Sequence, residues 1–212
     1  VKYKKLMLQA EQEYEDTKNP ALLKDISKYN NIQMAKKISL NSAYGAIGNN
    51  WFRYYDLLIA TAITTAGQLS IRWIEKALNI HLNKILKTEK IDYVIASDTD
   101  SVYITFDALV HKIFGEGQET GKVVTFLDKL AKEKLEPFID KSYLALATHM
   151  NAYDQKMQMA REVIADKGIW TAKKRYILNV YDSEGVRYKE PKLKMMGIEA
   201  VKSSTPAPCR EK

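Results

Sequence analysis

The chain has 212 residues and a net charge of +7, and its 46% hydrophobic and 28% charged residues are typical of a globular protein. Its single cysteine, Cys209, excludes an internal disulfide and a zinc site built on cysteines, and fits a reducing, cytoplasmic setting. The charged N-terminal segment lacks the apolar core of a signal peptide. No apolar run approaches the roughly 20 residues that span a bilayer, so we expect no membrane partner.

The excess of positive charge is concentrated toward the C-terminal end. Between residues 167 and 212, lysine and arginine outnumber aspartate and glutamate by 11 to 5. A local basic surface is typical of proteins that bind a polyanion such as nucleic acid. On charge alone, a solvated surface without a ligand explains the pattern equally well.

The first part of the sequence predicts three helices. Residues 3–17 are rich in Lys, Glu, Gln and Leu and predict the first. Apolar residues recur at three- and four-residue spacing from Leu22 and predict a second helix to about Tyr44, which would form a helical hairpin with the first. A third, long helix is expected from an N-cap at Asp56 to about Leu86.

A β-hairpin is expected next. Residues 91–96 are β-prone, and apolar and polar residues alternate with a period of two at 102–106. The two strands would be joined across Asp98-Thr99-Asp100. Carboxylates two positions apart at a strand end can point the same way.

The remaining residues predict one more long helix and a second hairpin. The helix covers 123–150 after a loop at 115–121, and Pro137 would bend or interrupt it. The segment from Gln158 is β-prone again, and strands at 176–181 and 186–188 flank the turn Asp182-Ser183-Glu184-Gly185. The order of elements predicts an α+β fold in which helices back an antiparallel sheet.

Asp98 and Asp100 suit a divalent cation. Mg²⁺ prefers oxygen ligands and commonly binds one or two carboxylates together with substrate phosphates. Two such ions can stabilise the attacking and leaving oxygens of a phosphoryl transfer. Aspartate is also common in turns, so the pair taken alone is better explained as a solvated hairpin turn.

The segment Lys37–Gly45, KISLNSAYG, carries an unusual helix face. Lys37, Asn41 and Tyr44 fall at positions i, i+4 and i+7, which lie on one side of a helix. An ammonium, an amide and a phenol on one face suit a ligand that has both a phosphate and an aromatic base. A lysine–asparagine pair on a solvated face is the simpler alternative.

A basic cluster at Lys173, Lys174 and Arg175 enters a strand beside Tyr176 and shortly after Trp170. Cations next to aromatic residues suit contacts to a nucleic-acid backbone or groove. Five further cations continue this basic surface: Arg187, Lys189, Lys192, Lys194 and Lys202. Basic clusters also often face solvent without any ligand.

These three motifs, in this order, resemble those of the family B DNA polymerases, most closely the enzymes of T4-like bacteriophages. K-x-x-x-N-S-x-Y-G at 37–45 resembles the fingers-helix motif, D-T-D-S at 98–101 the palm-hairpin motif, and K-x-Y at 174–176 the motif that follows the primer–template duplex. Three connecting segments are also similar to this family, so that the resemblance covers essentially the whole chain: WFRYYD at 51–56, ATAITTAGQ at 60–68 and KLKMMGIEAVKSSTP at 192–206.

The resemblance implies template-directed transfer of dNMP from a dNTP to a primer 3′-OH with two Mg²⁺ ions. Asp100 would be the main metal ligand, bridging both ions, and Asp98 a second carboxylate that shapes the site. Thr99 would lie where the hairpin approaches the primer end. Glu162 corresponds to an acidic palm residue near the metals.

The resemblance also assigns the nucleotide-binding residues. Lys37 would contact the incoming triphosphate, where a cation offsets charge that develops on the leaving pyrophosphate. Asn41 would lie beside the phosphate and sugar, and Tyr44 under the nascent base pair. Lys4 would be a second triphosphate contact from the partner fingers helix.

The remaining implied contacts are to DNA, from Lys173, Lys174, Arg175 and Tyr176. The resemblance divides the chain into part of the fingers at 1–48, the palm at 49–200 and the start of a connection to the thumb at 201–212. Ala96-Ser97 stands where the family usually has Tyr-Gly. This departure removes the backbone freedom of a glycine but removes no ligand.

The family's other catalytic aspartate, in a D-x-x-S-L-Y-P-type motif, lies upstream of the fingers and is absent from the sequence. The exonuclease domain and most of the thumb are absent as well. We therefore expect a fragment that is catalytically inactive or nearly so alone. Its partners would be primer–template DNA, dNTP and the remaining polymerase segments in cis or as a second chain, and its apolar patches would favour self-association.

Two other functions are compatible with the residues. The first is a non-catalytic DNA-binding or assembly module that uses the basic tail while its metal hairpin is vestigial. The second is a metal-dependent nuclease built on Asp98 and Asp100. The second is less well supported because the histidines, His81, His111 and His149, are scattered along the sequence.

Overall fold

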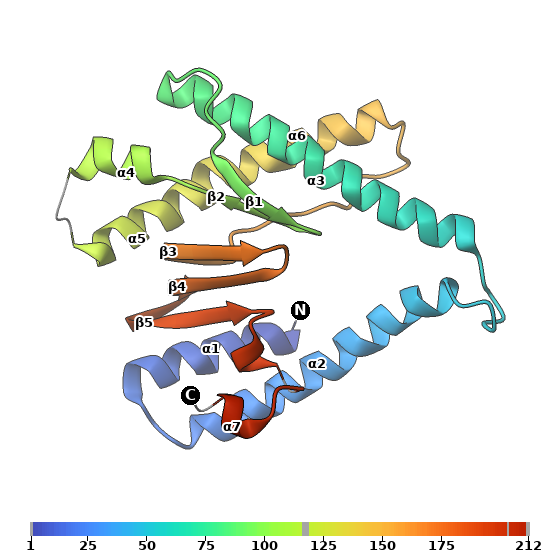
Figure 1. Cartoon of the computed structure of the whole chain (residues 1–212), viewed down its shortest axis with the longest axis horizontal. Helices are drawn as coiled ribbons and strands as arrows, with labels where there is room; N and C mark the ends of the chain where they lie inside the picture. The colour runs from blue at the N-terminus through green and yellow to red at the C-terminus, as the bar shows by residue number, and fades with distance from the viewer. Residues whose placement is uncertain (1, 116–118, 203, 211–212) are drawn as a thin grey trace. The chain divides into compact units, whose positions relative to one another are not determined.

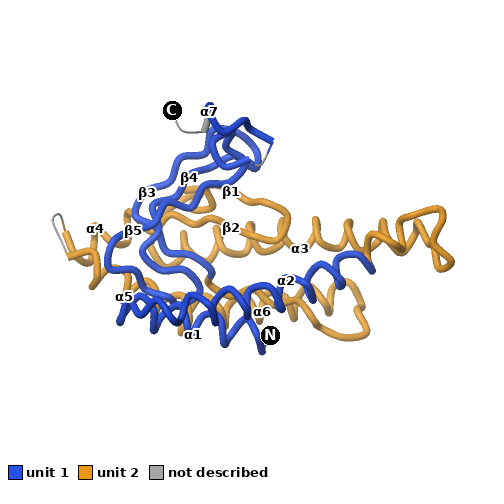
Figure 2. Tube along the Cα trace, turned by 90° about the horizontal axis from the view of Figure 1, so that it is seen from below, with its two compact units in different colours: residues 1–43, 162–212 blue, residues 44–161 orange. Residues whose placement is uncertain are grey.

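The structure is a computed structural model that describes residues 2–115, 119–202 and 204–210. It divides the chain into two compact units (Figure 2). The first unit comprises residues 1–43 and 162–212, and the second comprises residues 44–161. Helices and antiparallel strands both occur, which confirms the predicted α+β class. The expected single sheet is divided in two, with two strands in one sheet and three in the other.

The first unit begins with the predicted helical hairpin. Helix α1 covers Lys2–Thr17, and α2 covers Leu22–Ile47, whose last four residues belong to the second unit. The turn between them contains Pro20, and the Asn19 side chain accepts a hydrogen bond from the Ala21 N–H at 3.1 Å. The ends of both helices agree with the sequence prediction to within a few residues.

The second half of the first unit is a three-stranded antiparallel sheet in the order β3-β4-β5 (Figure 1). The strands cover Val163–Ala172, Arg175–Ser183 and Val186–Met196. Every second residue of β4 is buried, so that one face of this central strand contributes to the core: Tyr176, Leu178, Val180 and Asp182. This alternation is the period-two pattern expected for a strand with one buried face.

The predicted turn between β4 and β5 is confirmed. Ser183 pairs with Val186, so Glu184 and Gly185 form a two-residue turn. Their φ angles of 52° and 93° are both positive, as the primed hairpin turns require. The Asp182 carboxylate accepts a hydrogen bond from the Gly185 N–H at 3.0 Å and fixes the turn from inside.

Helix α1 packs against β5 through polar contacts. The buried Glu15 carboxylate pairs with Lys18 on its own helix and with Lys192 on β5. The Gln12 side chain accepts a hydrogen bond from the Arg187 N–H at 2.9 Å. Hydrogen bonds from Lys18 and then Lys192 hold the pKa of Glu15 below its usual range.

The contact of α1 with β5 should therefore weaken in acid. A carboxyl group whose pKa is lower in the folded state contributes stability above its unfolded pKa of about 4.3 and loses it as the pH falls through the folded value. We expect the free energy of unfolding to be lower for Glu15→Gln than for the wild type at pH 7, and the difference to shrink steadily as the pH falls below the unfolded pKa of about 4.3. Urea unfolding from pH 3 to pH 7 measures it. A difference that does not depend on pH would contradict the role of the Glu15 charge.

The second unit is built on α3, which covers Leu57–Leu86. Its predicted N-cap is confirmed, because the Asp56 side chain accepts a hydrogen bond from the Ile59 N–H at 3.0 Å. The helix ends at Lys87 in the left-handed conformation. Hairpin strands β1, Val94–Asp98, and β2, Ser101–Ile104, follow.

The predicted helix at 123–150 is present but is not uniform. It consists of α5 (Thr120–Leu130), a π-helical turn (Ala131–Leu135) and α6 (Glu136–His149). Pro137 lies in the first turn of α6 and has no N–H to donate. The wider π turn accommodates this proline without ending the helix. A short helix α4, Asp107–Phe114, was not predicted.

The core of the second unit lies between α3, β1 and the α5–α6 helix. Ile74 and Leu78 of α3 are fully buried, and ten buried residues form one cluster: Ile74, Leu78, Leu82, Tyr93, Val94, Ala131, Leu135, Ile139, Tyr143 and Leu146. The Trp73 indole N–H donates to the Ser142 carbonyl at 3.0 Å and joins α3 to α6. The C-terminal half of α3 therefore fixes the strand that carries Asp98.

The N-terminal half of α3 is apolar but exposed. Leu57, Leu58, Ile59 and Ile63 are each about half exposed or more, and among the described residues α3 alone is long and apolar enough to cross a membrane. This is weak evidence for a span, because core helices of soluble proteins share that length and composition.

Candidate metal, nucleotide and nucleic-acid sites

The acidic hairpin is a tight turn. Asp98 pairs with Ser101 across the two strands, so Thr99 and Asp100 alone form the connection. Thr99 has a φ of 53°, in the left-handed region. The turn is held locally, because the Asp98 carbonyl accepts from the Asp100 N–H at 2.6 Å and from the Ser101 hydroxyl at 3.1 Å.

The two aspartate side chains have different surroundings. The Asp98 side chain is partly buried and accepts a hydrogen bond from the Thr99 hydroxyl at 3.0 Å. The Asp100 side chain is exposed and has no hydrogen bond or ion pair within the part of the chain that the structure describes. Asp100 is therefore free to bind an external ligand, while Asp98 is also engaged in the turn.

These donors fit Mg²⁺ in chemical type, because both are hard carboxylate oxygens. They do not form a complete site. Over residues 2–115, 119–202 and 204–210, no group of three or more His, Cys, Asp or Glu side chains could hold a metal ion. An ion at Asp100 would need further oxygen ligands from phosphates, water or another carboxylate.

The KISLNSAYG segment lies in the C-terminal half of α2. Residues 34–45 of this helix are all exposed, including Lys37, Asn41 and Tyr44. Lys37 and Asn41 are one helical turn apart on the same side, as the sequence predicts. The ammonium and the amide are accessible to a ligand.

Lys4 and Glu162 both have charged partners in the first unit. Lys4 on α1 pairs with Glu184 at the β4–β5 turn. Glu162, which precedes β3, pairs with Lys194 on β5 at 2.7 Å. A phosphate at Lys4 would therefore compete with Glu184, and a cation at Glu162 with Lys194.

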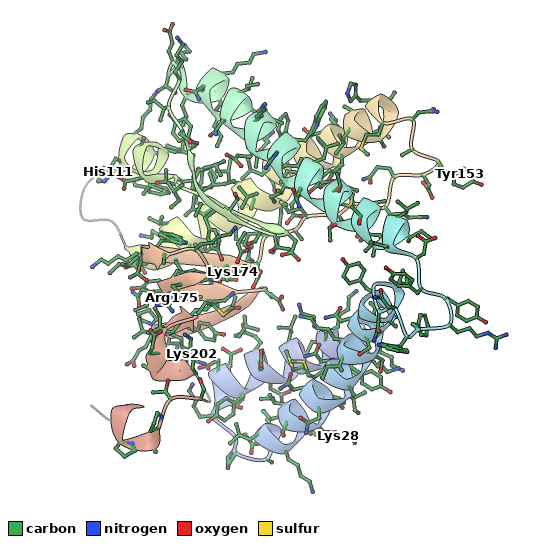
Figure 3. The ribbon with its side chains drawn as sticks, turned by 45° about the vertical axis from the view of Figure 1, so that its right-hand side comes forward. Lys28, His111, Tyr153, Lys174, Arg175 and Lys202 are labelled. Carbon is green, nitrogen blue, oxygen red and sulfur yellow. The ribbon has the colours of Figure 1, made fainter. Side chains whose placement is uncertain are left out.

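The predicted basic cluster forms the turn between β3 and β4, which we call the basic turn, Lys173–Arg175. All three side chains are exposed, and Lys174 has a φ of 63°. Figure 3 labels Lys174 and Arg175 at this turn. Arg175 pairs with Glu199 at 3.1 Å, and Lys202 pairs with the same carboxylate at 3.1 Å. A hydrogen bond from Lys202 and the nearby Arg175 charge lower the pKa of Glu199, which stays ionised and bridges the two cations.

Tyr176 is the least accessible residue of the K-x-Y motif. Only 7% of it is exposed, and it pairs across the sheet with Trp170, with 6.4 Å between the ring centroids. The predicted residues of this cluster are thus brought together, with the three cations outward and the tyrosine inward.

Gly197 determines the position of the basic turn, and it does not belong to the motifs predicted from the sequence. Its φ is +65°, and a Cβ atom there would lie 2.2 Å from the Lys174 carbonyl oxygen. Only glycine allows this close approach of two backbone segments. The signal in the sequence was a glycine directly after the Met195-Met196 pair, inside a segment already recognised as similar to the polymerases.

Comparison with known proteins places these motifs in a family. The model of DNA polymerase family B matches residues 2–206. The chain is 50% identical over 184 residues to the DNA-directed DNA polymerase of Escherichia phage RB69, covering 82% of this chain and 20% of that protein. It is 46% identical over 191 residues to the DNA-directed DNA polymerase of Enterobacteria phage T4, covering 86% of this chain and 21% of that protein.

A more distant relative is the DNA polymerase beta of African swine fever virus, which is 27% identical over 178 residues, covering 80% of this chain and 14% of that protein. The chain spans about a fifth of the length of the phage relatives it matches. The family model matches nearly all residues of the chain, which shows that the chain belongs to DNA polymerase family B.

Proposed function

We propose that the chain is a segment of a replicative DNA-directed DNA polymerase and contributes to transfer of dNMP from a dNTP to a primer 3′-OH. The observation that carries the proposal is the Asp98–Asp100 turn, in which the Asp100 carboxylate is exposed and unpaired within the described residues of a family B chain. In the reaction the 3′-oxygen attacks the α-phosphorus and pyrophosphate leaves.

Mg²⁺ bound at the hairpin, two ions in the complete enzyme, supplies charge stabilisation to the attacking and leaving oxygens. Asp100 is the main ligand and Asp98 the second carboxylate. Lys37 binds the triphosphate and offsets negative charge on the pyrophosphate, while Asn41 and Tyr44 contact the sugar and the nascent base pair.

The basic turn binds the primer–template duplex. Lys173, Lys174 and Arg175 present their charges outward, which suits contacts to phosphates that carry no sequence information. Tyr176, the fourth residue proposed for duplex binding, is only 7% exposed, so in this proposal it acts mainly by packing against Trp170 and supporting the turn that carries the three cations. Thr99 approaches the primer end from the hairpin.

Lys4 is a second triphosphate contact in the proposal, and its binding requires release from Glu184. Glu162 is an acidic residue near the metals and likewise has to leave Lys194. We retain the division into fingers at 1–48, palm at 49–200 and a connection toward the thumb at 201–212. The division rests on the motifs, and the compact units of the chain follow different limits.

The metal site is completed by a carboxylate from another polymerase segment, supplied in cis or as a second chain. The exposed apolar residues of α3 suit contact with such a segment and also self-association. The expected setting is the cytoplasm of the host cell, where primer–template DNA and dNTP are present.

The test is primer extension with Mg²⁺ and dNTPs after this chain is mixed with an upstream polymerase segment that carries the D-x-x-S-L-Y-P-type aspartate. We expect no extension by either piece alone and extension by the mixture. Assembly of the two pieces without extension would contradict the proposal. The same mixture with the upstream aspartate replaced by alanine is the matched negative control.

A DNA-binding module without catalysis is the second candidate, and the exposed basic turn is the observation that favours it. Lys174→Ala is expected to weaken binding to duplex DNA of any sequence and to reduce the slope of log K against log salt by about one. Fluorescence anisotropy from 50 to 300 mM salt, about the range where such slopes are usually measured, provides the data.

Lys28→Ala is the matched control for this measurement, because Lys28 is an exposed lysine of α2 away from the basic turn (Figure 3). An equal change in slope for both variants would show that only net charge matters. DNA binding with a normal slope but without extension in the mixture would favour the module over the polymerase.

A further inference from the structure

The segment that enters the acidic hairpin is attached to α3 by two asparagines, Asn79 and Asn83. They lie one helical turn apart and partly buried in the C-terminal half of α3, next to the buried Leu78 and Leu82. Both side chains bind the backbone of the connection between α3 and β1. Neither residue belongs to the three motifs discussed above.

Asn79 binds the first residues of the strand. Its side-chain oxygen accepts from the Tyr93 N–H at 2.9 Å and from the Val94 N–H at 3.2 Å. Its amide nitrogen donates to the Asp92 carboxylate at 2.7 Å. Asp92 in turn accepts from the Val94 N–H at 3.1 Å, so the side chains of Asn79 and Asp92 share one backbone donor.

Asn83 binds the connection at Ile91, before the residues that Asn79 binds. Its side-chain oxygen accepts from the Ile91 N–H at 3.1 Å, and its nitrogen donates to the Ile91 carbonyl at 2.7 Å. The nitrogen also donates to the Asn79 carbonyl at 2.8 Å, and the oxygen accepts from the Thr88 hydroxyl at 2.9 Å. Thr88 then bonds to the buried Tyr93 hydroxyl at 2.8 Å.

These contacts use nearly the full hydrogen-bonding capacity of the two amides. A side-chain amide offers two acceptor positions on oxygen and two donors on nitrogen. Asn83 uses all four, and Asn79 uses three. An aspartate would keep the acceptors but lose the donors, and at position 79 it would place a carboxylate against Asp92.

The anchored residues fix the register of β1. Tyr93 and Val94 are buried, and Asp98 follows four positions after Val94 in the same strand. Side chains alternate between the faces of a strand, so a shift of one residue would move Asp98 to the opposite face and displace it by about 3.3 Å. Metal and catalytic groups have to be held to within about 0.5 Å.

We propose that Asn79 and Asn83 are positioning residues, which act through the β1 backbone to place Asp98 and Asp100 for metal binding. The inference rests on the proposed function, because it takes the hairpin as the metal site. The two asparagines touch neither substrate nor metal in this role. They affect only the positions of the Asp98 and Asp100 carboxylates.

The placement is measured without any metal by pulsed electron spin resonance on this chain. Labels are attached at Lys76→Cys, on the exposed face of α3, and at Ser97→Cys on β1, in a Cys209→Ser background. The expected result is one narrow distance distribution for the parent protein. Asn79→Asp and Asn83→Ala should each broaden or shift it.

Two further variants separate positioning from a general loss of stability. Trp73→Phe removes a hydrogen bond from α3 to α6 and should leave the label distance unchanged. Asn79→Asp combined with Asp92→Asn restores a donor–acceptor pair with its direction reversed and should restore the narrow distribution. If the single variants do not fold, the double variant still tests the contact between residues 79 and 92. Recovery of folding in the double variant would support the contact, and failure to recover it would contradict the contact.

The second readout is primer extension by the chain mixed with its upstream segment. Loss of supporting contacts around a metal site typically costs about 10- to 100-fold in metal affinity, so Asn79→Asp should raise the Mg²⁺ concentration at half-maximal rate by that factor. The KM for dNTP should stay unchanged, since Lys37 and Asn41 lie on a different helix. The double exchange should recover most of the loss.

The possible outcomes separate the two claims. Unchanged label distances in folded Asn79→Asp and Asn83→Ala, or an equal change in Trp73→Phe, would overturn the positioning role. A shifted distance with an unchanged Mg²⁺ requirement would instead overturn the hairpin as metal site, and with it the inference. A shifted distance together with a raised Mg²⁺ requirement supports both.

Discussion

Asp100→Ala is expected to lower kcat for primer extension by about a thousandfold or more in the mixture of this chain with its upstream segment. A metal ion contributes several kcal/mol of stabilisation to the charge of a phosphoryl transfer, and each 1.4 kcal/mol is about a factor of ten in rate. Asp100 is the exposed carboxylate of the turn, and the described residues contain no group of three or more metal-binding side chains that could hold the ion without it. Single-turnover extension at saturating dNTP measures the loss.

Two other aspartates of the second unit give the controls. Asp98→Asn should cost much less than Asp100→Ala, because Asp98 is partly buried and already bonded to the Thr99 hydroxyl. Asp107→Ala removes an exposed carboxylate of α4 that pairs with His111, and it should leave extension unchanged. Equal rates for the wild type and Asp100→Ala would refute the catalytic role of the hairpin.

Gly197→Ala is expected to destabilise the first unit and to move the basic turn. The substitution places a side chain in a left-handed conformation, which costs about 1–2 kcal/mol. It also brings a Cβ atom to 2.2 Å from the Lys174 carbonyl oxygen, so the backbone of one segment has to shift. We therefore expect a loss of more than about 2 kcal/mol in the free energy of unfolding together with weaker DNA binding.

Gly185→Ala separates conformational strain from the clash. Gly185 also has a positive φ, 93°, but no atom lies within 4 Å of the Cβ position. It should therefore lose stability through strain alone and keep the DNA affinity of the wild type. Urea unfolding and anisotropy with duplex DNA measure both effects. Equal losses of DNA affinity in the two variants would contradict the claim that Gly197 fixes the position of the basic turn.

The elements with strong local signals were predicted from sequence. The helix capped by Asp56 and the Glu184-Gly185 turn are determined by neighbouring residues, a capping side chain and a pair of positive φ angles. The long helix with Pro137 was predicted in outline. Pro137 could have bent the helix, ended it or been accommodated within it. The outcome depends on the π-helical turn before it, and the stability of that turn comes from packing that the sequence does not show.

Other features of the structure were not predicted from the sequence. Helix α4 is eight residues long, too short for periodicity to distinguish it from the flanking loops. Tyr176 and Arg175 are neighbours in sequence, but the alternation of β4 buries one and exposes the other. The two asparagines of α3 are poor helix formers, and their presence in a long helix was a signal that could have been followed.

The candidate sites followed a similar division. The residues of each motif were placed together by the sequence because each motif is one turn or one helix face. Their partners were not predicted: Glu184 at Lys4, Lys194 at Glu162 and Glu199 at Arg175 are ion pairs between segments that only the fold brings together.

The exposed half of α2 has a consequence for ligand affinity. Every residue of this helix from 34 to 43 is exposed, and Lys36 lies over the Tyr3 ring of α1 at 5.6 Å, so packing contributes little there and the helical state depends mainly on local propensity. A short helical segment that has little packing is only marginally stable in water, so it interconverts with coil. For the triphosphate contact proposed at Lys37, the measured dissociation constant would then equal the intrinsic constant divided by the helical fraction. Substitutions that only raise helicity on the opposite side of α2 would tighten binding without any new contact to the nucleotide.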